Sequence, residues 1–345
     1  MTQSASPSVT VIIVNYNAGD RLQRCFDRLA AQTFQNFETI LVDNGSADHS
    51  LDHARSARLP VLIDEAGENL GFAAANNRAA KTAKGEWLAF LNPDAYPESD
   101  WLKSLLAAAA RHPGVDAFGS TQIDASDPSL LDGAGDAYHF SGVPYRGHHG
   151  WAVEDLPPEG ECFAPCAAAA MYRRSTFEAL GGFEESFFCY CEDVDLGFRL
   201  RLAGGRAIQI PDARVLHEGS GVTGRRSDFT VYHGHRNRIW AWYRNMPLAL
   251  LIASAPFQLI ANSYLLIRFA LLGEAKPYLR AMRDGFAGLP AQTASRRDIQ
   301  GSRTVSTNKL AKTFAWSPLK LFRKEAKIFC GTRKSGKLAD ISPQL

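Results

Sequence analysis

Two carboxylates and a histidine lie shortly after apolar or aromatic runs, where they could hold a cation and move a proton. These residues are Asp94, Asp193 and His217. The runs that precede them span residues 87–91, 187–190 and 213–216. In an α/β protein, polar side chains at strand ends lie at the edge of the sheet where ligands bind. The pattern therefore suggests an enzyme that binds a divalent cation and takes a proton from a nucleophile.

The elements that must position these residues follow from the apolar pattern of the first third of the chain. Apolar runs bounded by polar residues predict strands at 9–14, 38–42, 61–63 and 87–91. One-sided apolar spacing predicts helices that begin near Asp20, Phe72 and Asp100. From about residue 120 to 161 we expect loops and short strands. The alternation predicts an α/β fold with a mostly parallel central sheet flanked by helices.

The turn after the first predicted strand, Asn15-Tyr16-Asn17, is unlike a phosphate-binding loop. The chain contains no G-x-x-x-x-G-K-[ST] motif, and no G-x-G-x-x-G follows this strand, which argues against P-loop and dinucleotide-binding enzymes. The two Asn side chains and the Tyr ring could instead hydrogen-bond to and stack on a nucleobase. Asp43, at the tip of the second strand, could accept a hydrogen bond from a pyrimidine N–H or a ribose hydroxyl. Such residues also occur at strand ends for turn reasons alone.

Seven short blocks, spread over roughly residues 8–245, resemble the family 2 glycosyltransferases in order and spacing. The likeness is to the rhamnosyltransferase-like branch. The blocks are VNYN at 14–17, VDNGS at 42–46, NLGFAAANN at 69–77, FLNPD at 90–94, GGF at 181–183, EDVDL at 192–196 and PDARVLH at 211–217. The resemblance implies the GT-A fold, a nucleotide-diphosphate sugar donor and inversion at the anomeric centre.

The resemblance also assigns a donor site and a metal site. The donor nucleotide would be bound by Asn15, Asn17, Asp43, Asn76 and Asn92. Asp94 would be the metal-binding acid of the family's D-x-D motif, with His217 as a further ligand. One carboxylate and one imidazole leave room for diphosphate oxygens and suit Mg²⁺ or Mn²⁺. Asn92 stands where the family has the first acid, so this position brings no charge to the metal.

The block at 192–196 would supply the groups that act on the acceptor. Asp193 matches the family's catalytic position, so we expect it to remove the proton of the acceptor hydroxyl. Glu192 would orient the acceptor, and Asp195 could support the start of the following helix. Acids in a first helical turn also favour the macrodipole, so their presence alone does not prove a catalytic role.

We therefore predict an inverting, metal-dependent hexosyltransferase that acts on a lipid-linked or cell-surface glycan in polysaccharide biosynthesis of the cell envelope. By the resemblance alone, the expected donor is dTDP-L-rhamnose, while UDP-hexoses and a galactofuranose donor remain open. An alternative from another class is a catalytically inactive scaffold of a glycan-assembly complex, because Asn92 weakens the metal site.

Charge and cysteine usage indicate a compartment and a partner. The net charge is +2, yet residues 291–345 carry twelve Lys or Arg against three Asp or Glu, a net of +9. A basic tail on an acidic body favours an anionic membrane surface, and the tail shows no aromatic platform for nucleic acid. Residues 1–8 carry no secretion signal, so we expect a cytosolic protein whose six cysteines are reduced. The protein could also form a homo-oligomer.

The segment 247–272 is apolar and contains one charge, Arg268. Its other polar residues include Ser254, Gln258 and Asn262, which share one side of a helix with Arg268. Because Pro256 disfavours a single straight membrane span, we interpret the segment as an interfacial helix pair; packing on the catalytic domain and a dimer contact are the alternatives.

Together these patterns divide the chain into three parts. We expect a GT-A catalytic domain at 1–245, an amphipathic, membrane-associating helical extension at 246–290 and a basic C-terminal tail at 291–345. The protein would then lie peripherally on the cytoplasmic face of the cell membrane.

Overall fold

The computed structural model describes residues 6–219 and 227–329 of the 345-residue chain. The end of the predicted basic tail, residues 330–345, lies outside the described residues. The strands are β1 (Val9–Asn15), β2 (Phe37–Asp43), β3 (Val61–Glu65), β4 (Trp87–Leu91), β5 (Ala95–Pro97), β6 (Ala117–Asp124), β7 (Leu131–Gly133), β8 (Asp136–His139), β9 (Val143–Arg146), β10 (Gly160–Cys162), β11 (Ala169–Arg173) and β12 (Ala207–His217). The helices of the first two thirds of the chain are α1 (Asp20–Ala30), α2 (Ser50–Arg55), α3 (Gly71–Ala80), α4 (Trp101–Arg111), α5 (Arg174–Ala179) and α6 (Glu192–Leu202).

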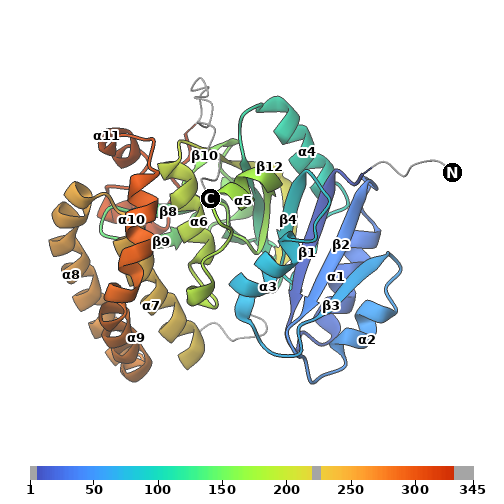
Figure 1. The fold of residues 1–345 in the computed structure, drawn as a ribbon, viewed down its shortest axis with the longest axis horizontal. Coiled ribbons are helices and arrows are strands. Elements are labelled where there is room, and N and C mark those ends of the chain that lie inside the picture. The colour runs from blue at the N-terminus through green and yellow to red at the C-terminus, as the bar shows by residue number, and fades with distance from the viewer. Residues whose placement is uncertain (1–5, 220–226, 330–345) are drawn as a thin grey trace.

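The central sheet has the strand order β10-β12-β6-β11-β4-β1-β2-β3, with β5 paired to β12 and β7 to β6. Strands β4, β1, β2 and β3 run parallel to one another, while β11 is antiparallel to both β4 and β6. β12 is parallel to β6 and therefore runs in the same direction as β4. The carboxyl ends of β1, β2, β4 and β12 consequently meet at one edge of the sheet (Figure 1).

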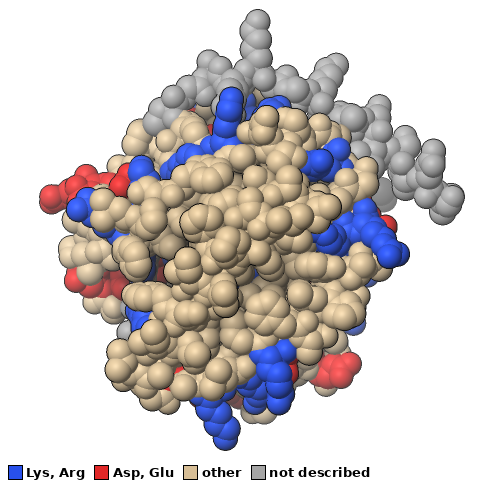
Figure 2. Space-filling view, turned by 90° about the vertical axis from the view of Figure 1, so that its left-hand side faces the viewer, with Lys and Arg blue, Asp and Glu red and all other residues tan. Residues whose placement is uncertain are grey.

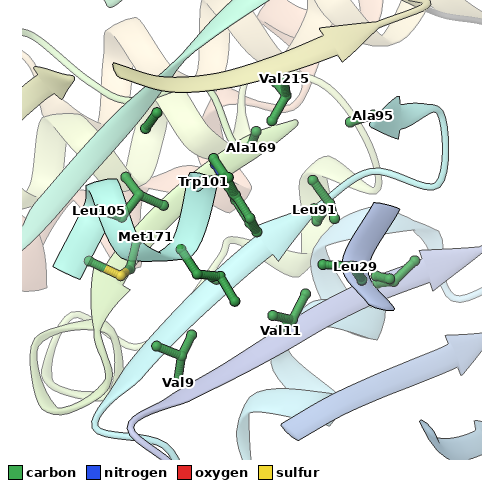
Figure 3. Packing of buried hydrophobic residues seen from close by; sticks show 14 of the residues in the cluster. Val9, Val11, Leu29, Leu91, Ala95, Trp101, Leu105, Ala169, Met171 and Val215 are labelled. Atoms are coloured by element: carbon green, nitrogen blue, oxygen red, sulfur yellow. The ribbon is translucent and has the colours of Figure 1, made fainter. Parts of the chain in front are cut away.

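Helices cover both faces of this sheet because its central strands are apolar on both sides. All seven residues of β1 are buried. On one face, Val9 and Val11 pack with Leu29 of α1 and with Trp101 and Leu105 of α4 (Figure 3). On the other face, the apolar residues of β1 and β2 pack against α3 and α6. The α/β class and GT-A-type architecture expected from the sequence are therefore confirmed.

The four predicted strands agree with β1 to β4 to within two residues at their ends, and the three predicted helices begin within one residue of α1, α3 and α4; α2 and β5 were not predicted. The region expected to hold loops and short strands is more ordered in its first part. There β6 extends from Ala117 to Asp124 as a fully buried strand between β11 and β12. The hairpin β8–β9 forms a separate two-stranded sheet that lies outside the main one.

A second layer of helices packs beside the sheet, at the left of Figure 1. It contains α7 (Asp228–Asn245), α8 (Leu248–Leu271), α9 (Ala275–Ala287), α10 (Thr293–Gly301), α11 (Thr307–Ala311) and α12 (Pro318–Arg323). The segment interpreted as a helix pair is instead the single continuous helix α8, which runs through Pro256. The described part of the predicted tail, residues 291–329, contains α10, α11 and α12 and is folded against the body.

Phe314 shows how far this C-terminal segment enters the core. Its side chain is fully buried, and its ring centroid lies 5.6 Å from that of Tyr138, 5.9 Å from that of Phe163 and 5.7 Å from that of Phe198. The backbone of the segment also pairs with the body, since Ala315 N donates to the carbonyl oxygen of Tyr138 at 2.8 Å. Residues 291–329 therefore contribute to the stability of the catalytic domain.

We expect Phe314→Ala to lower the free energy of unfolding by about 3–5 kcal/mol, because it removes a large ring from a closed aromatic cluster. The matched control is Phe322→Ala, which removes the same group from a side chain that is 63% exposed and should change stability by no more than about 0.5 kcal/mol. Urea denaturation of both variants checks the difference. Equal stabilities would mean that residues 291–329 do not stabilise the fold.

Candidate active site

Asp94 and His217 are brought together by strand pairing at the carboxyl edge of the sheet. β5 begins one residue after Asp94, and its first residue, Ala95, lies opposite His217 in the β5–β12 register. Both side chains are buried, and His217 Nε2 lies 3.4 Å from Asp94 Oδ1. The sequence placed each residue after a strand, but only this register makes them neighbours.

His217 is oriented by Asp132, a residue that the sequence analysis did not identify. His217 Nδ1 donates to Asp132 Oδ2 at 2.7 Å, and both residues are about 2–3% exposed. Burial alone would lower the pKa of His217, but the carboxylates of Asp132 and Asp94 raise it to about 9. Nε2 has no well-formed hydrogen bond among the described residues. The negative charge around His217 fits a cation held between its ring and Asp94.

A cavity of about 210 Å³ opens in front of this pair. Its wall includes Tyr16, Asn44, Asn69, Asn92, Asp94 and His217. Tyr16 is 40% exposed, which leaves its ring available for stacking on a ligand. A pocket with an aromatic ring, several amides and a cation-competent pair is suited to a nucleotide diphosphate.

Three of the residues that we predicted to bind the donor bond instead to the loops at the ends of β1 and β2 and do not line this cavity. They are Asn15, Asn17 and Asp43. Asn15 Nδ2 donates to Asp43 Oδ1 at 2.7 Å and to Ser50 Oγ at 2.8 Å. Asn17 Oδ1 accepts from the backbone N–H of Ala47 at 2.8 Å. These bonds join the ends of β1 and β2 and hold the turn that carries Tyr16 against the cavity.

Asn76 is also separate from the cavity. Its Nδ2 donates to the carbonyl oxygen of Phe72, one turn earlier in α3, at 2.8 Å, and its side chain is buried. Asn92, in contrast, lines the donor cavity and a second cavity beside it. Of the five residues predicted to bind the donor nucleotide, Asn92 is the one that lines the donor cavity.

The second cavity has a volume of about 240 Å³ and is lined by Glu192 and Asp193 from the start of α6. Asp193 is partly exposed there, and its Oδ2 accepts from the backbone N–H of Ala167 at 3.1 Å. Glu192 is buried, and its burial together with the neighbouring Asp193 raises its pKa well above the usual range. The two acids therefore differ: Asp193 faces the cavity with a side chain oriented by the Ala167 N–H, whereas the buried surroundings of Glu192 disfavour its charged form.

A third acid of the same helix has a structural role. Asp195 is fully buried and bonds to Arg199 at 2.8 Å and to Asn245 at 2.7 Å. Although burial would raise the pKa of Asp195, Arg244 and Arg199 hold it below its usual value. Asp195 thus ties α6 to α7 and does not reach the cavity.

The loop 187–191 separates the two cavities from the helical layer and has an unusual backbone. Three of its residues, none of them glycine, have φ angles between 65° and 72°. Asn237 of α7 stabilises this conformation by donating to three carbonyl oxygens of the loop at 2.8–2.9 Å. Gly71 allows the loop to approach α3, because a Cβ at this position would lie 2.5 Å from the Phe188 ring. Backbone strain of this kind is common where a site must be held in one geometry.

Arg146 lies at the boundary of the two cavities and is a second residue that the sequence analysis missed. It ends β9, lines both cavities and pairs with Asp132 Oδ2, the oxygen that also receives His217. Its other terminal nitrogen contacts Cys166 Sγ at 3.2 Å. Gly133 makes room for it, because a Cβ there would lie 2.3 Å from Arg146 Cγ. The hairpin β8–β9, which no sequence motif marked, thus supplies a positively charged side chain to the site.

Asp136, from the other strand of this hairpin, lies close to Asp193 and Cys166. Burial, with the nearby Asp193 adding to it, raises the pKa of Asp136 to about 8. Asp136 therefore keeps its proton at neutral pH and adds no charge beside Asp193.

The fold is of the GT-A type, and two adjoining cavities lie at the carboxyl edge of its sheet. The family model described as glycosyl transferase family 2 matches residues 10–181. The chain is 30% identical over 293 residues to N-acetylglucosaminyl-diphospho-decaprenol L-rhamnosyltransferase of Mycobacterium tuberculosis, a match that covers 76% of this chain and 93% of that relative. The chain belongs to glycosyl transferase family 2 and is a glycosyltransferase.

Another relative agrees with this assignment, and two solved structures agree with the fold. The O-antigen biosynthesis protein RfbC of Myxococcus xanthus is 33% identical over 242 residues, which cover 65% of this chain and 18% of that protein. The mannosyltransferase of Pyrobaculum calidifontis, solved with GDP-Man and Mn²⁺, superposes with a TM-score of 0.53 at 19% identity and covers 90% of this chain and 87% of its own. S. aureus TarS 1–349 with UDP-GlcNAc has a TM-score of 0.53 at 16% identity over 97% and 100% of the two chains. These two structures support the fold alone.

Proposed function

We propose that this protein transfers L-rhamnose from dTDP-L-rhamnose to a hydroxyl of a lipid-linked or cell-surface glycan, with inversion at the anomeric carbon. The observation that carries the proposal is the pair of adjoining cavities, one with Asp94 and His217 and the other with Asp193. The similarity to a rhamnosyltransferase over most of both chains supports the donor sugar and the lipid-linked acceptor. A lipid-linked acceptor would place the reaction at the cytoplasmic face of the membrane.

In this mechanism Asp193 is the general base. A hydroxyl of the acceptor lies in the second cavity, and Asp193 removes its proton as the hydroxyl oxygen attacks the anomeric carbon from the side opposite the diphosphate. The anomeric C–O bond breaks, and the diphosphate leaves with the bonding electrons. Glu192, which lines the same cavity, would orient the acceptor.

The leaving diphosphate needs positive charge, and the donor cavity offers two sources. Asp94 and His217 would hold Mg²⁺ or Mn²⁺, with Asn92 available as an uncharged oxygen ligand. When bound, this cation would neutralise charge on the departing phosphates. Arg146 is the second source: a guanidinium carries five N–H donors, and its contacts to Asp132 and Cys166 leave others for phosphate oxygens.

We expect Asp193→Asn to lower kcat about 10²- to 10⁴-fold, because the amide keeps the shape of the side chain but cannot take a proton. Donor binding should stay nearly unchanged, since Asp193 lines the acceptor cavity only. Asp212→Asn, at an exposed carboxylate of β12, is the matched control and should retain full activity. Steady-state transfer and calorimetric donor binding test this, and undiminished turnover in Asp193→Asn would exclude it as the base.

Asp94→Asn should remove the dependence of donor binding on Mn²⁺. For the natural protein, donor at one hundred times its dissociation constant should add about 2.7 kcal/mol of stability with Mn²⁺ present. The variant should show the same small thermal shift with Mn²⁺ and with EDTA. If the natural protein itself gave equal shifts with and without metal, Asp94 and His217 would not form a metal site.

Arg146→Ala should weaken binding of the nucleoside diphosphate product about 10- to 100-fold, because a charge-assisted hydrogen bond contributes about 1.5–3 kcal/mol. Binding of the nucleoside monophosphate should change little. Arg146→Lys keeps the charge beside Asp132 and should restore part of the diphosphate affinity. Calorimetry with both nucleotides distinguishes phosphate binding from a structural role. If Arg146 were only structural, its removal would weaken binding of the two nucleotides equally.

A further inference from the structure

The polar side of α8 faces the protein and its apolar side faces outward. Ser254 and Gln258 are buried, and each receives a hydrogen bond from α7: Trp242 Nε1 donates to Ser254 Oγ at 2.9 Å, and Arg238 donates to Gln258 Oε1 at 3.0 Å. The second terminal nitrogen of Arg238 donates to Asn262 Oδ1 at 2.5 Å. The polar stripe of this helix is therefore used for packing.

The opposite side of α8 is exposed and strongly apolar. Five aliphatic side chains on it, Ile252, Leu259, Ile260, Ile267 and Leu271, are 62–83% exposed. A surface helix in water normally has the reverse arrangement, with apolar residues inward and polar residues outward. An inverted helix of this length indicates that its outer side is covered by something apolar.

The apolar surface continues from α8 onto the C-terminal segment through ring contacts. The Phe140 ring lies 5.6 Å from Phe257 of α8 and 4.3 Å from Trp316, while Tyr264 of α8 lies 5.5 Å from Phe322 of α12. Trp316 and Phe322 are 50% and 63% exposed. We call this surface, formed by α8, Trp316 and α12, the apolar face.

Basic residues surround the apolar face. Figure 2 shows a broad area without charged side chains, whose margin carries mostly Lys and Arg with some Asp and Glu, chiefly at the left. Residues 248–329 contain thirteen Lys or Arg and four Asp or Glu, a net charge of +9. Lys276, Arg280, Lys312 and Arg323 are exposed members of this set. A second copy of the chain docked by twofold symmetry would bring two basic margins together, whereas anionic lipid would complement them.

We propose that the apolar face docks on the surface of an anionic lipid bilayer, with α8 lying in the plane of the membrane. By length and composition alone, α8 could cross a bilayer. However, its bonds to Arg238 and Trp242 hold one side of it on α7, so lipid cannot surround it. This inference names the surface behind the membrane location proposed above, and it depends neither on the donor nor on catalysis.

Vesicle binding by the full chain tests the proposal. The natural protein should sediment with phosphatidylglycerol-containing vesicles and bind phosphatidylcholine vesicles more weakly. Leu259→Ser with Ile260→Ser should weaken binding to the anionic vesicles about tenfold or more, because two exposed aliphatic side chains no longer enter the interface. The matched control is Leu62→Ser, at a 54% exposed leucine of β3, which should bind like the natural protein.

Charge is tested separately with Lys276→Gln and Arg280→Gln, which should weaken binding to anionic vesicles but not to phosphatidylcholine vesicles. Light scattering without lipid tests whether a second copy of the chain covers the apolar face instead. A natural protein that is dimeric, becomes monomeric in Leu259→Ser/Ile260→Ser and ignores vesicles would overturn the proposal in favour of a self-interface. Equal vesicle binding by the natural protein and the double variant would overturn it as well.

Failure of this proposal can be distinguished from failure of the proposed function. Transfer to a short, water-soluble acceptor should be unchanged in the double variant, because neither substituted residue lines a cavity of the active site. Loss of vesicle binding with full activity on this acceptor supports the proposal. Vesicle binding by a protein that transfers no sugar would leave the membrane surface intact and refute the enzymatic proposal alone.

Discussion

A single carboxylate oxygen, Asp132 Oδ2, holds the two groups that form the donor end of the site. It accepts a hydrogen bond from His217 Nδ1 at 2.7 Å and forms an ion pair with Arg146. Burial would raise the pKa of Asp132, but Arg146, His149 and His217 hold it far below its usual range. One buried anion thus fixes the ring of a predicted metal ligand and a cation at the boundary of both cavities. Asp94 Oδ1 lies 3.4 Å from His217 Nε2, so the same histidine brings Asp94 next to this group.

This arrangement gives a physical context for Asn92. An amide in place of an acid lowers the negative charge available to a metal. Arg146, which lines the same two cavities as Asn92, adds positive charge there. In the proposed mechanism the leaving diphosphate therefore depends less on a strongly held metal and more on a fixed guanidinium. On the acceptor side, burial disfavours the charged forms of Asp136 and Glu192, while Asp193 is oriented by the backbone N–H of Ala167.

Helix α7 connects the active site to the apolar face through two consecutive residues. Asn237 bonds to three carbonyl oxygens of the loop 187–191, and Arg238 bonds to Gln258 and Asn262 of α8. The loop lines both cavities, and α8 forms the surface that we propose to meet lipid. A lipid-linked acceptor would thus encounter a membrane surface and an acceptor cavity held in a fixed relation by one helix.

The sequence by itself determined the α/β class, strands β1 to β4, the starts of α1, α3 and α4, the family, and the location of Asp94 and His217 at strand ends. These features depend on local apolar patterns and on short motifs. The tertiary structure alone decided that Asn15, Asp43 and Asn76 bond to protein groups away from the cavity, that Arg146 lines it and that Asp132 orients His217. It also decided that α8 is one helix and that its polar stripe accepts hydrogen bonds from buried donors of α7. A pattern shows which side of a helix is polar, but only the neighbouring helix determines which side is buried.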